Sequence, residues 1–101
     1  MHTNISNKIP LLINICKQYK VTKLYLFGSV LTEKFNNKSD IDLLVEFDKK
    51  LSPLERGELF WQLNDMLPSI FYRKVDLITT DSLRNKYFIE NINKTKMVIY
   101  E

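Results

Sequence analysis

The sequence has 101 residues, a formal net charge of +3, 45% hydrophobic residues and 27% charged residues. These values are ordinary for a folded globular protein, and they argue against disorder and against a second hydrophobic core. We therefore expect a single domain over residues 1–101. The basic residues are scattered rather than clustered, which disfavours nucleic acid as a partner.

The N-terminal segment has a short apolar centre, but no strongly basic start and no small-residue cleavage site. It is interpreted as an amphipathic helix rather than a signal peptide. No apolar run approaches the ~20 residues of a membrane-spanning helix, so no membrane association is expected. Cys16 is the only cysteine, which rules out a disulfide within the chain and favours the reducing cytoplasm.

The first predicted helix has apolar residues at helical spacing between Ile5 and Cys16. Pro10 fits its first turn, so we expect the helix to begin near Ser6 or Asn7, either of which could cap it. No catalytic role is expected for Cys16, because nothing near it in sequence would lower the pKa of its thiol.

A short buried strand is predicted over residues 23–27, and it ends at Gly28. The following run, 29–35, is compatible with a turn or two of helix, and residues 36–39 predict a polar loop. The second strand is predicted over 41–47, with alternate residues on opposite faces. Ile41, Leu43, Val45 and Phe47 share one face, and Asp42, Leu44 and Glu46 share the other.

Ser52-Pro53-Leu54-Glu55 is a capping box with proline at the first helical position, so a helix is predicted to start there. We expect Pro68 to end this helix. Trp61 lies off the centre of its apolar stripe, and we expect it either to be partly buried or to edge an interface. The stripe consists of Leu59, Phe60, Leu63, Met66 and Leu67.

The third strand is predicted over residues 74–79, and Asp81 is expected to cap a last helical segment. The residues MVIY near the end predict either a short fourth strand or a docked tail. Helices and strands thus alternate along the chain, which indicates an α/β (α+β) fold.

The connections between the strands predict a small mixed sheet flanked by helices. The first two strands can bring Gly28 beside Asp40 only if they are antiparallel, and the short connection between them allows this. The second and third strands are joined through a whole helix, as a parallel pair requires. Parallel pairing would place Asp76 beside Asp40 and Asp42 at one edge of the sheet.

Asp40, Asp42 and Asp76 are the candidate metal ligands and catalytic residues. Asp40 and Asp42 lie on the same side of their strand, about 6.5–7 Å apart along it. Carboxylates so close repel one another unless a cation neutralises them, and an incomplete set of oxygen ligands suits Mg²⁺. One or two metal ions could there activate a hydroxyl and neutralise a leaving pyrophosphate.

Gly28 and Ser29 are the candidate nucleotide-binding residues. Glycine lets the backbone approach a phosphate closely, and the amides at a helix start point toward an anion. The serine hydroxyl offers a further donor. Each aspartate also has a structural interpretation, since Asp40 could simply cap a turn. That interpretation weakens for Asp42 and Asp76, because aspartate is disfavoured inside an apolar strand.

Gly28-Ser29, ten residues, Asp40-Ile41-Asp42 and a later Asp76 resemble the signature of the DNA polymerase beta-type nucleotidyltransferase superfamily. The chain is most similar to the minimal nucleotidyltransferases (MNT-type) of bacteria and archaea. The resemblance extends from the first helix to the segment YFIENINKTK, and it implies the nucleotidyltransferase fold with a mixed sheet.

The resemblance also implies a Mg²⁺-dependent transfer of a nucleoside monophosphate, AMP from ATP or another nucleoside triphosphate, to a hydroxyl. Asp40 and Asp42 would bind two metal ions, Asp76 would bind the catalytic ion and help to deprotonate the acceptor, and Gly28 and Ser29 would hold the triphosphate. Such proteins often act as antitoxins that adenylylate a tyrosine of a small helical HEPN-type toxin, which makes such a toxin the expected partner.

The segment after Ser29 departs from the family pattern. Many of these antitoxins have arginines directly after Gly-Ser, whereas this chain has no basic residue until Lys34. The triphosphate would then depend on Lys34, on Lys38 or on residues of a partner. The alternative function is a non-catalytic module of the same fold that neutralises its partner by contact.

Overall fold

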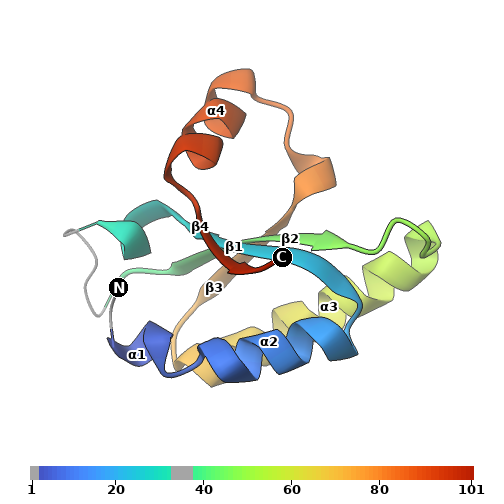
Figure 1. Ribbon diagram of the computed structural model, residues 1–101, viewed down its shortest axis with the longest axis horizontal. Coiled ribbons are helices and arrows are strands. Elements are labelled where there is room, and N and C mark those ends of the chain that lie inside the picture. The colour runs from blue at the N-terminus through green and yellow to red at the C-terminus, as the bar shows by residue number, and fades with distance from the viewer. Residues whose placement is uncertain (1–2, 33–37) are drawn as a thin grey trace.

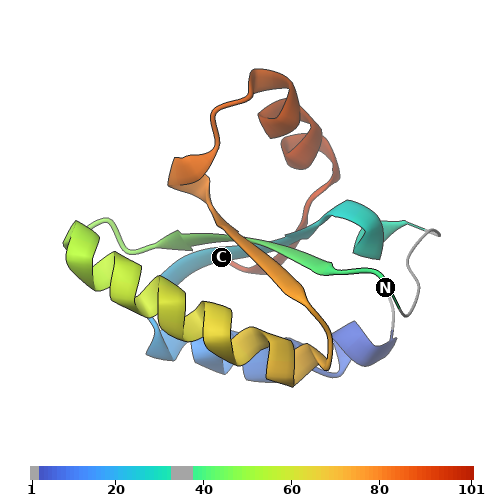
Figure 2. The ribbon, with the colours of Figure 1, turned by 180° about the vertical axis from the view of Figure 1, so that it is seen from behind.

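The computed structural model describes residues 3–32 and 38–101. Four strands form a single mixed sheet in the spatial order β3-β2-β1-β4. Helices α2 and α3 lie on one side of the sheet, which we call the inner face, and α4 stands on the opposite, outer face (Figures 1 and 2). The strands are β1 (Val21–Phe27), β2 (Ile41–Phe47), β3 (Val75–Thr79) and β4 (Met97–Tyr100).

The N-terminal segment forms a short turn of helix, α1 (Thr3–Ser6), and then the helix α2 (Ile9–Gln18). Pro10 lies in the first turn of α2, as predicted, but the N-cap is Lys8, without a side-chain hydrogen bond. The predicted start near Ser6 or Asn7 is therefore wrong. Because Pro10 has no N–H, a helix continuous with Ser6 would lose its bond to that carbonyl, and the chain breaks there instead.

The segment around Gly28 differs in part from its prediction. Strand β1 begins at Val21, earlier than predicted, and ends at Phe27 as predicted. A single 3₁₀ turn, η1 (Gly28–Leu31), follows, which lies within the predicted turn or two of helix, and Thr32 is already extended. The remainder of that prediction, together with Lys34 and the loop residues 36–37, lies outside the described residues.

Strand β2 has the predicted bounds, and helix α3 (Pro53–Phe71) begins with the predicted capping box of Ser52 and Glu55. The predicted end at Pro68 is wrong, because Pro68 lies inside the helix, which continues to Phe71. Phe71 is buried in the inner core. Its burial offers a physical reason for the extra turn, despite the hydrogen bond that proline cannot donate.

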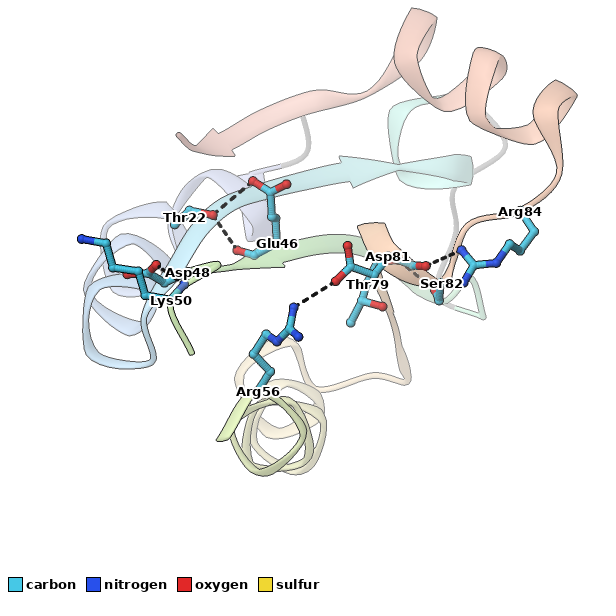
Figure 3. A network of polar contacts seen from close by, with 9 residues as sticks. All are labelled: Thr22, Glu46, Asp48, Lys50, Arg56, Thr79, Asp81, Ser82 and Arg84. Atoms are coloured by element: carbon cyan, nitrogen blue, oxygen red, sulfur yellow. Dashed lines mark hydrogen bonds and ion pairs between the residues drawn. The ribbon is translucent and has the colours of Figure 1, made fainter. Parts of the chain in front are cut away.

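After β3 the chain forms an arch over the outer face, made of the 3₁₀ turn η2 (Thr80–Ser82) and helix α4 (Lys86–Thr95). The predicted cap is wrong: Asn85 caps α4, and Asp81 instead forms an ion pair at 3.3 Å with Arg56 of α3 (Figure 3). The MVIY segment is a strand, β4, which pairs antiparallel with β1.

The larger core lies between the sheet and the inner helices, and it includes Leu12, Leu26, Leu43 and Leu67. A smaller cluster on the outer face joins Tyr25, Phe27 and Leu44 to Ile92 of α4. Trp61 is 62% exposed, so its predicted partial burial is wrong. No helix in the described ranges is long and apolar enough to span a membrane.

Candidate active site

The sheet brings the predicted aspartates together at the edge where β2 and β3 begin. The strands β1 and β2 are antiparallel and pair Phe27 with Asp42, and the strands β2 and β3 are parallel and pair Asp42 with Asp76. Asp42 therefore lies between the end of β1 and the start of β3, as the connection lengths predict. It shares the outer face with Leu44, where α4 stands.

Two independent observations explain why the residue beside Asp42 at position 28 is glycine. Its φ of +80° lies in the left-handed region, which favours glycine. A Cβ atom at this position would also overlap Oδ2 of Asp42 and would lie 3.2 Å from its Cγ. The first turn after β1 thus lies so close to the Asp42 carboxylate that a side chain at residue 28 would overlap it.

Asp42 is costly to keep ionised. Burial raises the pKa of its carboxyl, and the neighbouring carboxylates of Asp76 and Asp40 raise this pKa further. Asp76 is exposed, whereas Asp40 and Asp42 are half-buried. A cation near these carboxylates would therefore stabilise their ionised forms, above all that of Asp42.

Two basic residues that the sequence interpretation missed border this edge. Nζ of Lys74 lies 4.0 Å from Oδ2 of Asp40, and Nη1 of Arg73 donates a 2.9 Å hydrogen bond to the carbonyl of Ser39. Parallel pairing of β2 with β3 was itself predicted, and it places the residues just before β3 beside those just before β2. Carrying this register back to residues 73 and 74 could have found both bases.

Ser29 is half-buried in η1. Its carbonyl accepts hydrogen bonds from the backbone N–H and from the Oγ1 hydroxyl of Thr32, each at 2.9 Å. These bonds hold the turn after Gly28 closed, and they use the serine's carbonyl rather than its hydroxyl. The predicted role of Gly28 and Ser29 in nucleotide binding is not tested by this geometry and stays a prediction.

A hollow of about 600 Å³ adjoins Gly28 and Asp42. It is bounded on one side by η1 and the end of β1, and on the other by Phe88, Asn91 and Thr95 of α4. Its volume lies in the range of small-molecule sites, ~300–1,000 Å³. The α4 residues were missed because no local pattern indicates that this helix folds back over the sheet.

The aspartates fit a metal that shares its coordination with a substrate. Within residues 3–32 and 38–101, no three His, Cys, Asp or Glu side chains form a ready-made metal site. A closed cage is not what Mg²⁺ requires, because it keeps several waters and shares phosphate oxygens with its substrate. An all-carboxylate donor set with a raised Asp42 pKa suits such an ion. The metal roles of Asp40, Asp42 and Asp76 remain predictions.

Residues 11–101 match the family model described as "Polymerase beta, Nucleotidyltransferase". The chain belongs to this nucleotidyltransferase family. It is 36% identical over 83 residues to the "Putative protein adenylyltransferase MJ1217" of Methanocaldococcus jannaschii, and the alignment covers 82% of this chain and 81% of that one. The predicted family is thus confirmed.

Solved structures share the fold. A structure described as a "putative minimal nucleotidyltransferase" matches with a TM-score of 0.70 and 20% identity, over 92% of this chain and 90% of that chain. A chain from the complex of the tri-AMPylated Shewanella oneidensis HEPN toxin with its MNT antitoxin matches with a TM-score of 0.64 and 22% identity. That match covers 94% of this chain and 71% of the other. The predicted mixed-sheet nucleotidyltransferase fold is confirmed.

Proposed function

We propose that this nucleotidyltransferase transfers AMP from ATP to a hydroxyl of a partner protein, and that the partner is a HEPN-type toxin modified on a tyrosine. The observation that carries the proposal is the placement of Asp42 against Gly28, with Asp76 beside it. The relative named as a protein adenylyltransferase supports AMP as the group transferred. The fold shared with a toxin–antitoxin complex supports the partner.

The proposed reaction forms one bond and breaks one. The acceptor oxygen bonds to the α-phosphorus of ATP, the bond from that phosphorus to its bridging oxygen breaks, and pyrophosphate leaves. The proton of the acceptor hydroxyl passes to the carboxylate of Asp76, the exposed member of the cluster. Asp76 can serve an acceptor that arrives from solvent on a partner protein because it is exposed.

The remaining residues hold the triphosphate. Because Gly28 has no side chain, the phosphates of the triphosphate can approach the Asp42 carboxylate closely. Without a cation between them, these negative groups would repel each other. Asp40 and Asp42 would hold Mg²⁺, which supplies positive charge for the phosphates and lowers the pKa of the acceptor hydroxyl when it is bound. Lys74 lies within reach of Asp40 and offers basic charge at the same edge, where the family's usual arginines are missing.

The test uses the purified chain with Mg²⁺, labelled ATP and a candidate HEPN-type toxin, such as one encoded by a neighbouring gene. We expect AMP to appear on a tyrosine of that protein, detected by the mass of its peptides. Asp42→Asn should lower the rate at least about 100-fold, as for removal of a group that positions transition-state charge. Asp65→Asn, an exposed change on α3, is the matched control and should transfer AMP like the wild type.

Neutralisation by contact alone is the competing function, and the arginine-free run after Ser29 favours it. The same variants separate the two. If the wild type and Asp42→Asn silence the toxin equally well, and no AMP is found on it, then neutralisation by contact replaces AMP transfer as the function. A toxin silenced only when AMP is added supports the enzyme.

A further inference from the structure

One side of α4 forms the far wall of the hollow beside Asp42. Phe88, Asn91 and Thr95 line it, and their spacing of three and four residues places them on one face of the helix. Ile92, next to them, is the buried residue of α4 and packs against Tyr25, Phe27 and Leu44. The anchor at Ile92 thus holds this face toward the sheet rather than toward solvent.

Phe88 presents an aromatic surface to the hollow. Its side chain is 40% exposed, and its ring contacts Phe27 at a centroid distance of 6.1 Å and an interplanar angle of 82°. Phe27 stands perpendicular to Phe88 rather than flat on it, and Phe88 lines the hollow, so a flat ligand in the hollow can stack on its ring. Stacking on such a ring does not depend on which nucleobase is present.

Asn91 supplies the polar group that can distinguish one base from another. Thr95 uses its hydroxyl proton in a 2.9 Å hydrogen bond to the backbone carbonyl of Asn91. The Asn91 carboxamide itself has no hydrogen-bond partner in the part of the chain that the structure describes. It offers one donor group and one acceptor, the pair of groups that binds the edge of adenine in a bidentate manner.

Two other hollows, lined by described residues, are less suited to a base whose phosphates lie at Asp42. A hollow of about 240 Å³ beneath α4 is lined by Lys23, Glu46 and Lys96, and it does not include Gly28 or Asp42. A groove of about 460 Å³ lies at the opposite end of β2 and β3, beside the Arg56–Asp81 ion pair. The hollow between η1 and α4 is continuous with the predicted phosphate site.

We propose that α4 reads the base of the nucleotide: adenine stacks on Phe88, and the Asn91 carboxamide pairs with its edge. The inference rests on the proposed function, because it places the base of the same triphosphate whose phosphates lie at Gly28 and Asp42. It assigns the choice of ATP over other nucleotides to a single side chain on the arch.

The test exchanges the hydrogen-bonding pattern of residue 91. Asn91→Asp replaces a donor–acceptor pair with acceptors only, which suits the N–H groups of guanine rather than adenine. Equilibrium binding of non-hydrolysable ATP and GTP analogues is measured with Mg²⁺ present. We expect wild type to prefer the ATP analogue, and the variant to shift the ATP-to-GTP affinity ratio toward GTP by about 5- to 150-fold, the range for one bidentate pair.

Asn93→Asp is the matched control, because it makes the same charge change on α4 at the neighbouring smaller hollow. It should leave the ratio unchanged. Phe88→Ala should weaken both analogues by a similar factor, about 5- to 150-fold, whereas Phe88→Trp should retain binding. Far-UV circular dichroism of each variant checks that α4 is still folded.

The outcomes separate this inference from the proposed function. Failure of the wild type to bind either analogue overturns both. A wild type that binds and transfers AMP, while Asn91→Asp and Asn93→Asp share its affinity ratio, overturns the reading of the base by Asn91 alone. Preference of the wild type for the GTP analogue overturns it as well.

Discussion

The two faces of the sheet are built for different purposes. The inner face is covered by α2 and α3 with a continuous apolar layer in which Leu12, Leu26 and Leu43 have no exposed surface. The outer face is covered by α4 through a much smaller cluster, and it also has the half-buried carboxylate Asp42. Stability is concentrated on the inner face, and the predicted chemistry on the outer one.

Polar contacts supplement the sparse packing of the outer face. The Tyr25 hydroxyl donates a 3.1 Å hydrogen bond to Glu101, and Nζ of Lys96 lies 4.2 Å from the centroid of the same ring. Arg56 ties the arch to α3 through Asp81 (Figure 3). An element held by few apolar contacts opens at lower free energy than the core, which suits one wall of a ligand site.

The largest expected effect is a cavity in the inner face. Leu43→Ala should lower the free energy of unfolding by about 2–5 kcal/mol, because the layer around it cannot collapse fully. Urea denaturation measures the change. Leu54→Ala, at a side chain that is 74% exposed, is the control. A loss below about 1 kcal/mol for Leu43→Ala would contradict the division between the faces.

Cys16 provides a second measure of the same variant. Burial raises the pKa of its thiol to about 12, so the native protein should resist alkylation at pH 8. Alkylation should then follow opening of the inner layer, and Leu43→Ala should accelerate it. Rapid labelling of the folded wild type would show that this layer is looser than its packing implies.

Ile92→Ala tests the outer cluster and should cost less, about 2 kcal/mol, at the low end for such truncations. The loss should be local: hydrogen exchange of the α4 amides should accelerate, while alkylation of Cys16 under native conditions should be nearly unchanged. Ile89→Ala, at a half-exposed position of the same helix, is the control. Equal acceleration at Cys16 would mean that the two faces unfold as one unit.

Ser52→Ala tests how far α3, and with it the inner layer, depends on its first turn. The Ser52 hydroxyl accepts a 3.1 Å hydrogen bond from the Glu55 amide, and the Glu55 carboxylate accepts one of 3.2 Å in return. Loss of the Ser52 hydroxyl should lower the free energy of unfolding by about 1 kcal/mol, as measured by urea denaturation. Ser69→Ala, later in the same helix, should change stability by less than about 0.5 kcal/mol.

Local chemistry could be predicted from the sequence, and distant contacts could not. The alternation along Ile41–Phe47 indicates the bounds of β2, and the Ser52–Glu55 capping box indicates the start of α3. The site follows from the lengths of the connections between strands, which predict that Asp76 lies beside Asp42. Each of these features depends on a few neighbouring residues or on the general rules for strand pairing.

The errors have a tertiary origin. Asp81 has the local character of a helix cap, but its partner is Arg56, 25 residues earlier in the chain. Pro68 has the local character of a helix end, but Phe71 beyond it packs into the inner core. The α4 wall of the hollow was missed for the same reason. A helix that closes over a sheet is positioned by contacts such as that of Ile92 with Leu44, which leave no local signal.

The effect with an unusual sign is expected at Asp42 itself. Its pKa is raised above the ordinary 3.8 by burial and by Asp76 and Asp40, so the folded state binds this proton more tightly than the unfolded chain. This contribution makes stability fall as the pH rises from about 3.8 through the raised pKa, and the loss persists at neutral pH.

Asp42→Asn removes that cost. At pH 7 we therefore expect the variant's free energy of unfolding, measured by urea denaturation, to exceed that of the wild type by on the order of 1 kcal/mol. The difference should shrink as the pH falls below about 3.8, where Asp42 becomes protonated in both states. Mg²⁺ with an ATP analogue should stabilise the wild type and not the variant. A variant less stable than the wild type at pH 7 would show that the Asp42 carboxylate supports the fold, and the outer face would no longer be the place where stability is given up for chemistry.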